Sequence, residues 1–306
     1  MKFVRVIATV AAVALLPGGC SATPESDLAG RTWLPEERRF IDEEALVEKL
    51  EAARFVLLGE IHDHPEHHRI RARLLEEALA DAGRKPVVAM EMISTEQRHA
   101  LLRYQQDERP DPAGLGEALD WNESGWPDWE IYQPIARVAF SRGLTLADAN
   151  LPRAEVREMV RAGGLASLDQ DRLEQLILDR SLPGKQDKRL VARLRASHCH
   201  GLSDEILKAM RDAQRLRDGH MAMRLREVAN RDGAVLIAGN GHQHNGYGVP
   251  WYLRRAGEES VFTVALIPVE PGKEKPQEYR TGEERLPFDA VRFTTPRPTP
   301  PPDPCA

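Results

Sequence analysis

Cysteine is scarce in this sequence. The chain has 306 residues and three cysteines, Cys20, Cys199 and Cys305. No two of them have the short spacing found in zinc sites or thiol oxidoreductases. The sequence therefore excludes metal sites built on cysteine pairs. It leaves open whether Cys199 and Cys305 form a disulfide in an oxidising compartment.

An excess of positive charge is also absent. Lysine and arginine together number 42, aspartate and glutamate 48, and the formal net charge is −6. The basic residues alternate with acidic ones, which is typical of solvated helix faces. No nucleic-acid partner is therefore expected. The chain also lacks a G-x-S-x-G motif, which argues against an ordinary serine esterase.

A long hydrophobic run occurs only at the N-terminus. Residues 6–16 are apolar apart from Thr9, basic residues precede them, and small residues lead up to Cys20. This pattern predicts a signal peptide over 1–19. Because Cys20 follows the small residues directly, the junction resembles a lipobox, in which that cysteine is acylated. The alternative is an ordinary signal peptide followed by an unmodified cysteine.

Lipidation of Cys20 would make residues 20–40 the lipidated N-terminus and its tether. The lipid would hold the protein on a membrane of the cell envelope, and we expect the outer membrane, on its periplasmic side. No internal segment is apolar enough to serve as a spanning helix.

Short apolar runs alternate with helix-like segments through the rest of the chain. The runs lie at 54–58, 86–90, 144–147, 234–238 and 260–267, with a further edge strand expected within 288–294. Strands that alternate with helices predict an α/β domain with a mainly parallel sheet and flanking helices. We place this domain at 41–294.

One long stretch lacks any strand signal. Residues 152–231 are charged and have helical periodicity, so they are predicted to form a helical insertion, or a lid, packed beside the sheet. The proline-rich stretch 295–306 is predicted to be a disordered tail.

Polar residues follow or end four of the predicted strands. They are Glu60, His62, Glu91, Asn150 and His242. In open parallel sheets, ligands bind beyond the carboxyl ends of the strands, so these side chains are expected to share one cleft. Two glutamates and two histidines suit a divalent metal ion or an acid–base pair of groups. Each residue taken singly is equally compatible with a structural role, such as a helix cap or a buried ion pair.

Several longer strings resemble one known family. They are LLGEIHDHPEHH, VVAMEM, WPDWEIYQPI, LADANLPR and LIAGNGHQHNGYGVPWYL, in that order between residues 54 and about 255. Together they resemble the motifs of ChaN-type lipoproteins. That family is similar to the wider Tiki and erythromycin-esterase-like group, with which this chain shares Gly59, His62 and Glu91.

The resemblance implies a lipoprotein of the cell envelope that binds haem or iron in iron uptake. It further implies that a homodimer holds haem between its protomers through a tyrosine–iron bond. Tyr247 and Tyr132 are the candidate ligands, with His64 and His68 expected near the haem propionates. The wider group implies an alternative, a hydrolase that uses a metal ion or its own histidine and glutamate side chains.

Lipidation of Cys20 is directly testable. Replacing it (Cys20→Ala) is expected to release the protein from the membrane fraction, because no other anchor is apparent in the sequence. Fractionation of cells that express each form, followed by mass analysis of the mature N-terminus, measures this. A variant that stays membrane-bound and is cleaved elsewhere contradicts the lipobox interpretation.

Overall fold

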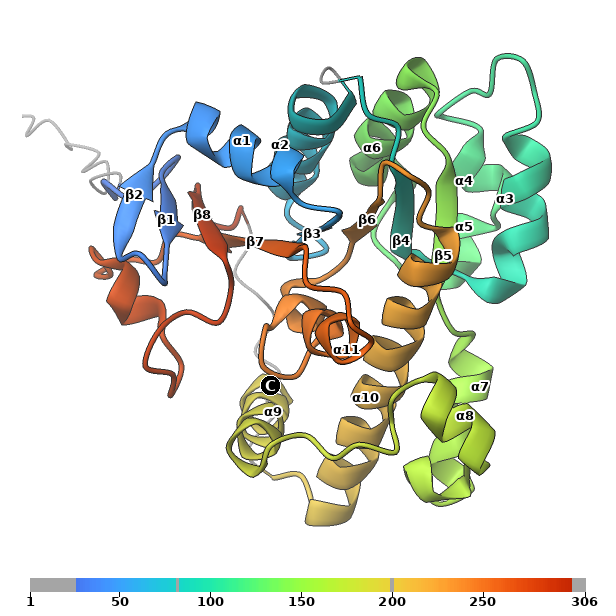
Figure 1. Cartoon of the computed structure of the whole chain (residues 1–306), viewed down its shortest axis with the longest axis vertical. Helices are drawn as coiled ribbons and strands as arrows, with labels where there is room; N and C mark the ends of the chain where they lie inside the picture. The colour runs from blue at the N-terminus through green and yellow to red at the C-terminus, as the bar shows by residue number, and fades with distance from the viewer. Residues whose placement is uncertain (1–25, 81–82, 199–200, 299–306) are drawn as a thin grey trace, which may run out of the picture.

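The computed structural model describes residues 26–80, 83–198 and 201–298 (Figure 1). The predicted signal peptide, the acylation site Cys20 and the cysteines Cys199 and Cys305 lie outside these residues. Within the described ranges, no helix combines the length and the apolar character needed to cross a membrane.

The core of the molecule is one sheet of eight strands in the order β2-β1-β8-β7-β3-β6-β4-β5. The strands are β1 (Thr32–Leu34), β2 (Arg39–Ile41), β3 (Phe55–Leu58), β4 (Val87–Ser94), β5 (Leu146–Asn150), β6 (Ala234–Ile237), β7 (Val261–Pro268) and β8 (Ala290–Thr294). Neighbours from β8 to β5 pair in parallel, whereas β1 is antiparallel to both β2 and β8. The predicted α/β fold with a mainly parallel sheet is confirmed.

The strands are apolar on both faces because helices cover both. In β3, Val56 and Leu58 pack into one core cluster while Phe55 and Leu57 pack into another. This alternation is the period-two pattern of a strand, and the continuous apolar run shows that both of its faces are buried.

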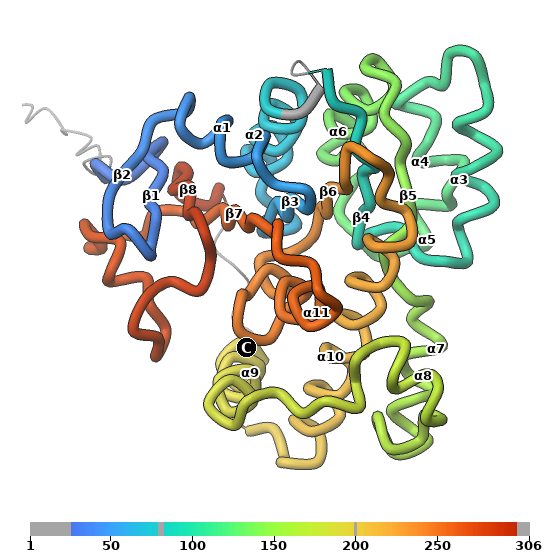
Figure 2. The backbone as a smooth tube through the Cα atoms, in the orientation of Figure 1, coloured from blue at the N-terminus to red at the C-terminus, as the bar shows by residue number. Residues whose placement is uncertain are grey.

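The helices that precede β5 in the chain cover one face of the sheet, and the helices that follow β5 cover the other face. The first face carries α1 (Glu43–Ala52), α2 (Pro65–Leu75), α3 (Arg98–Tyr104), α4 (Leu115–Ala118), α5 (Trp121–Ser124) and α6 (Trp129–Arg142). The second carries α7 (Arg153–Arg161), α8 (Gln170–Gln175), α9 (Gly184–Ser197), α10 (Asp204–Val228) and α11 (Val249–Arg255). In Figure 2, α1, α2 and α6 lie above the strands, α3, α4 and α5 lie at the right beside β5, and the second group lies below the strands.

The predicted helical insertion is one of these two layers. Helices α7 to α10 lie within 152–231, and α10 packs against β4, β5 and β6 through residues such as Leu216 and Leu225. The segment is therefore integral to the core, and the expectation of a lid beside the sheet is corrected. Its apolar positions are spaced as on one buried helix face, which periodicity alone does not distinguish from a separate lid.

The boundaries predicted for the two ends also need correction. Strands β1 and β2 lie within 20–40, the segment assigned to a tether, and Trp33 and Leu34 are buried. Strands of three residues are too short to leave a clear periodic signal. At the other end, Thr295 donates its backbone N–H to Glu66 at 3.0 Å, and Arg297 forms an ion pair with Asp63. The predicted disordered tail therefore has ordered contacts in its first residues.

Candidate functional site

The ends of three adjacent strands carry the predicted glutamates and histidines. Strand order places β6 between β3 and β4. Glu60 lies two residues beyond β3, Glu91 lies inside β4, and His242 lies in the short 3₁₀ helix η4 (Asn240–Gln243) after β6. A side chain at Gly59 would meet the carbonyl oxygen of Val264 at 3.0 Å, so a glycine suits the point where the chain turns from β3 toward the site.

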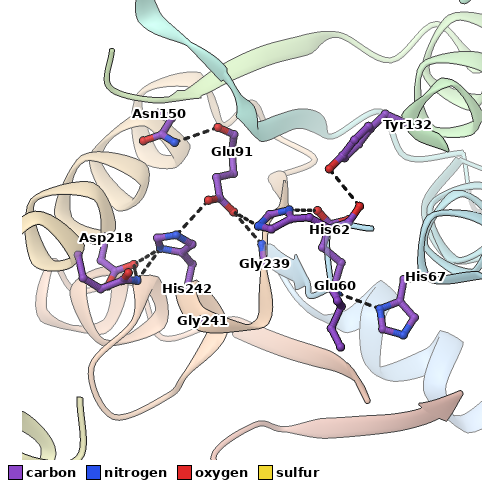
Figure 3. Close-up of polar contacts among 12 residues, drawn as sticks. Glu60, His62, His67, Glu91, Tyr132, Asn150, Asp218, Gly239, Gly241 and His242 are labelled. Carbon is purple, nitrogen blue, oxygen red and sulfur yellow. Dashed lines mark hydrogen bonds and ion pairs between the residues drawn. The ribbon is translucent and has the colours of Figure 1, made fainter. Parts of the chain in front are cut away.

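The four side chains form a continuous series of contacts (Figure 3). Nδ1 of His62 lies 2.6 Å from Oε1 of Glu60, and Nε2 of His62 lies 3.8 Å from Oε2 of Glu91. The other oxygen of Glu91 lies 3.1 Å from Nε2 of His242. The structure thus brings together the four residues that the strand ends predicted. Asn150 adjoins them through the backbone, because its amide donates to the carbonyl oxygen of Glu91 at 3.1 Å.

Asp218 extends the series by one residue. Its Oδ1 lies 2.6 Å from Nδ1 of His242. We call the series Glu60–His62–Glu91–His242–Asp218 the acid–base chain. Sequence reasoning missed Asp218 because it lies on α10, among many exposed charges. The one available signal was Gly219 beside it, since a glycine inside a long helix usually marks a close approach. A Cβ there would meet the carbonyl oxygen of Leu176 at 2.6 Å.

One member of the acid–base chain reaches solvent. Glu60, Glu91, His242 and Asp218 are all buried, whereas the side chain of His62 is 32% exposed. The ring of His62 also lies 4.8 Å from the ring of Trp126. His62 is therefore the most exposed member of the acid–base chain.

Mutual charge pairing governs the protonation of the chain. Burial opposes the cation of His242, but Glu91 and Asp218 outweigh it and raise the pKa of His242 to about 10. Burial likewise opposes the cation of His62, and Glu91 and Glu60 raise its pKa. Burial alone would raise the pKa of Glu91, yet His242, His62 and the Gly239 amide lower it well below its usual range. Both imidazole rings are thus held as cations beside carboxylates.

Arg71 anchors the first glutamate. It is fully buried, forms an ion pair with Glu60, and donates to Nδ1 of His68 at 2.7 Å. Burial raises the pKa of Glu60, but Arg71, His62 and His68 lower it to a net value below the usual one. The position of Arg71, in the second turn of α2, gave no sign that its charge would face inward.

The arrangement does not support the expectation of a divalent metal ion. Among residues 26–80, 83–198 and 201–298, no group of three or more histidines, cysteines, aspartates or glutamates is arranged to hold one. The physical reason is visible in the acid–base chain, where the nitrogen and oxygen atoms point at one another and not at a common centre.

The two candidate tyrosines lie in different surroundings. Both rings are buried, and they differ in their partners. On α6, the hydroxyl of Tyr132 donates to the carbonyl oxygen of His62 at 3.3 Å. Tyr247 stacks on His244 with ring centroids 3.6 Å apart, and Arg193 donates to its hydroxyl at 3.4 Å. Of the two, Tyr247 lines a cavity.

His64 and His68 are also buried and bonded within the protein. Nε2 of His64 lies 3.3 Å from the carbonyl oxygen of Thr295, and Nε2 of His68 donates to the carbonyl oxygen of His62 at 2.9 Å. Neither histidine lines the cavity beside Tyr247. Their observed contacts are structural.

The cavity beside Tyr247, here called the aromatic cavity, has a volume of about 790 Å³. It lies between α9 and the segment 279–288. Its lining combines apolar, aromatic and cationic side chains with one carboxylate: Lys185, Lys188, Arg189, Arg193, His244, Tyr247, Ile267, Tyr279, Glu283, Leu286 and Phe288.

The charged state of His242 leads to a prediction about pH. Its pKa rises from 6.5 to about 10 on folding, so its stabilisation is complete below pH 6.5 and is lost as pH approaches 10. Between pH 6.5 and pH 10, the unfolding free energy of the wild-type protein is expected to fall by an amount on the order of a few kcal/mol. In His242→Gln this fall is expected to be smaller, because the titrating imidazole is gone. Denaturant titrations across this range measure it.

His244→Gln is the matched control, because burial lowers the pKa of His244 to about 3 and its protonation no longer changes in that range. An unaltered pH dependence in His242→Gln contradicts the charged state assigned to His242.

Comparison with known proteins agrees with this geometry. A sequence model described as haem-binding uptake, Tiki superfamily, ChaN matches residues 46–253, more than half of the chain. No curated protein matches the sequence. Among solved structures, ChaN of Campylobacter jejuni, described with cofacial haem binding, aligns with a TM-score of 0.64 and 20% identity over 85% of this chain and 95% of that one.

A mutant of the erythromycin esterase EreC in its open conformation aligns with a TM-score of 0.39 and 18% identity, over 87% of this chain and 83% of that one. A score at this level does not establish a shared fold, whereas the likeness to ChaN of Campylobacter jejuni does. The match to the family model covers both β3 and His242, and so it spans the whole acid–base chain. The protein therefore belongs to the ChaN family of haem-binding uptake proteins in the Tiki superfamily.

Proposed function

We propose that this protein binds haem in the aromatic cavity and acts in haem or iron uptake as a lipid-anchored protein of the cell envelope. The observation that carries the proposal is the composition of that cavity, which suits a flat apolar ring with two carboxylates. Family membership supports haem as the ligand, and the acylation motif at Cys20 supports the anchor.

The volume of the aromatic cavity suits a ligand of this size. Sites that bury most of a drug-sized ligand span roughly 300–1,000 Å³, and the cavity measures about 790 Å³. Ile267, Leu286 and Phe288 supply apolar surface for a porphyrin ring.

The cations of α9 suit the propionates. Lys185 and Arg189 are paired with Glu284 and Glu283. Within the described part of the chain, Lys188 and Arg193 line the same cavity without forming an ion pair to a carboxylate. Arginine and lysine bind carboxylates through charge-assisted hydrogen bonds.

Two side chains at the cavity are able to ligate iron. Burial, with Arg193 and Arg189 nearby, lowers the pKa of His244 to about 3, so its ring is neutral, the form that binds metals. Burial raises the pKa of Tyr247, and Arg193 opposes that rise. Ferric iron, when bound, favours the phenolate of a tyrosine. Nδ1 of His244 accepts the Gly246 N–H at 2.9 Å and its Nε2 lies 3.3 Å from Glu283, so the imidazole would ligate iron only in place of the Glu283 contact. Tyr247 is therefore the donor that we assign to iron.

We also propose that haem is shared by two protomers. The aromatic cavity opens beside exposed residues of α9, among them Lys185 and Lys188, so a second copy can approach it. Haem-dependent dimerisation, measured by analytical ultracentrifugation, tests this part of the proposal.

Hemin titration tests the ligand assignment. Tyr247→Phe is expected to weaken hemin binding by at least about tenfold and to shift the Soret band, because it removes the anionic oxygen donor. Tyr132→Phe is the matched control, since Tyr132 is equally buried but lies outside the aromatic cavity and is bonded to the backbone of His62. Unchanged spectra and affinity in both variants would overturn the assignment. A loss in Tyr132→Phe alone would move the ligand to α6.

A second candidate function, a hydrolase that works without a metal ion, is favoured by the acid–base chain. His62 is its solvent-exposed member, and the carboxylates that flank it orient the ring and raise its pKa. A protonated histidine beside a cleft suits the general acid of a hydrolytic reaction.

Ester hydrolysis tests this second candidate. Turnover of p-nitrophenyl esters is expected to fall by about 100-fold in His62→Gln, in line with the usual contribution of an acid–base group. His99→Gln, an exposed histidine on α3, is the control. Turnover by the wild-type protein that is no faster than in buffer, or equal turnover in His62→Gln, rejects the hydrolase.

A further inference from the structure

A second cavity adjoins the acid–base chain and is separate from the aromatic cavity. It has a volume of about 440 Å³ and is lined by Glu91, Asn150 and Trp126, and by residues of α7 and α10. Trp126 connects it to His62, whose ring lies 4.8 Å away. We call this cavity the arginine cleft, for the three arginines in its wall.

Arg153, Arg157 and Arg217 line the cleft from α7 and α10. Within residues 26–80, 83–198 and 201–298, the guanidinium groups of these three arginines form no hydrogen bond and no ion pair. Arg153 instead lies over the ring of Trp126, with its guanidinium carbon 5.7 Å from the ring centroid. The Nε atom of Arg217 is buried and has no hydrogen-bond partner in the described structure.

Arg217 is half-buried, and its side chain differs in charge pairing from two buried arginines of this protein. Arg71 contacts Glu60, and Arg224 contacts Asp148 at 3.0 Å. A buried donor without a partner costs free energy, and that cost is removed when a ligand supplies an acceptor. Nε and Nη1 of Arg71 also lack hydrogen-bond partners, but the charge of Arg71 is paired with Glu60. Arg217 lines a cavity and, within the described residues, has no ion pair, so its charge and its donors point to a ligand with acceptor oxygens.

The acidic residues that line the cleft do not neutralise the three arginines. Glu91 faces Arg217 but is already engaged with His242 and with the Gly239 amide. The remaining acidic residues of the cleft, Glu96, Asp120 and Glu123, come from the segments around η2 (Thr95–Gln97) and α5. The cleft thus has a cationic wall and an acidic wall, which suits a ligand with its negative charge at one end.

We infer that the arginine cleft binds a small organic oxyanion, a carboxylate or a phosphate ester, with Arg153, Arg157 and Arg217 as its anion-binding residues. Guanidinium groups bind carboxylate and phosphate through two parallel N–H donors, so both anions share this recognition chemistry. The indole of Trp126 offers apolar surface for the organic part. Such a ligand would lie beside His62, the exposed member of the acid–base chain.

Calorimetric titration with a matched set of probes tests the inference. Phenyl phosphate and benzoate carry the same ring with different oxyanions, and benzyl alcohol carries the ring without charge. At least one of the two anions is expected to bind more tightly than benzyl alcohol, and rising salt is expected to weaken that binding. Which anion binds identifies the ligand chemistry.

Substitutions locate the binding. Arg217→Gln and Arg157→Gln are each expected to weaken anion binding by about tenfold, the usual effect of losing a charge-assisted contact. Arg157 is exposed, so its variant remains informative if Arg217→Gln fails to fold. Arg161→Gln, on the last turn of α7 and outside the cleft, is the matched control and is expected to bind as the wild type does.

Two results would overturn the inference: neither anion binds better than benzyl alcohol, or the cleft variants bind as Arg161→Gln does. The haem proposal has a separate readout, because Tyr247→Phe alters the aromatic cavity and leaves the arginine cleft intact. Wild-type protein that binds one of the small anions but has no affinity for hemin counts against the haem proposal alone, and hemin binding without anion binding counts against the arginine cleft alone.

Discussion

The buried carboxylate of Glu91 is the group on which the site depends. One of its oxygens lies 3.1 Å from His242, and the other accepts the Gly239 amide at 2.7 Å and faces His62. A buried carboxylate is costly unless it is paired and hydrogen-bonded, and these three partners meet that requirement. The register of the parallel strands brings these groups together. Met90 of β4 pairs with Ile237 of β6, and Ile237 pairs with Leu58 of β3. The residues that follow these positions are therefore neighbours at one edge of the sheet.

Sequence reasoning reached as far as this edge because parallel strands impose it. Apolar runs located β3, β4, β5, β6 and β7, and the rule that parallel strands end together placed Glu60, His62, Glu91 and His242 side by side. The same reasoning could not find Asp218, because a helix presents each residue to a face that depends on packing. Nor could it find the aromatic cavity, whose wall is the irregular segment 279–288. Strands β1 and β2 escaped notice because each is three residues long.

Charge balance explains why the arginine cleft needs arginines of its own. The acid–base chain contains three carboxylates, those of Glu60, Glu91 and Asp218, and two imidazolium rings. Arg71, which lies outside the chain and pairs with Glu60, supplies the third cation. These charges pair with one another inside the protein, so the chain has no cation to spare for an incoming anion. Within the described residues, Arg153, Arg157 and Arg217 form no ion pair with any of these groups, although the charge of Arg217 is attracted by Glu91.

The two cavities are distinct, yet a single loop shapes both. His242 belongs to the acid–base chain and His244, two residues later, lines the aromatic cavity. Backbone bonds hold the loop at each end: His242 donates to the Gly239 carbonyl at 2.9 Å, and Gly248 donates to that of His244 at 2.8 Å. A change in backbone conformation that moves one histidine must therefore move the other. Close packing accounts for the glycines on both sides of the two histidines, since side chains at Gly239 and Gly248 would meet His62 and the His242 backbone.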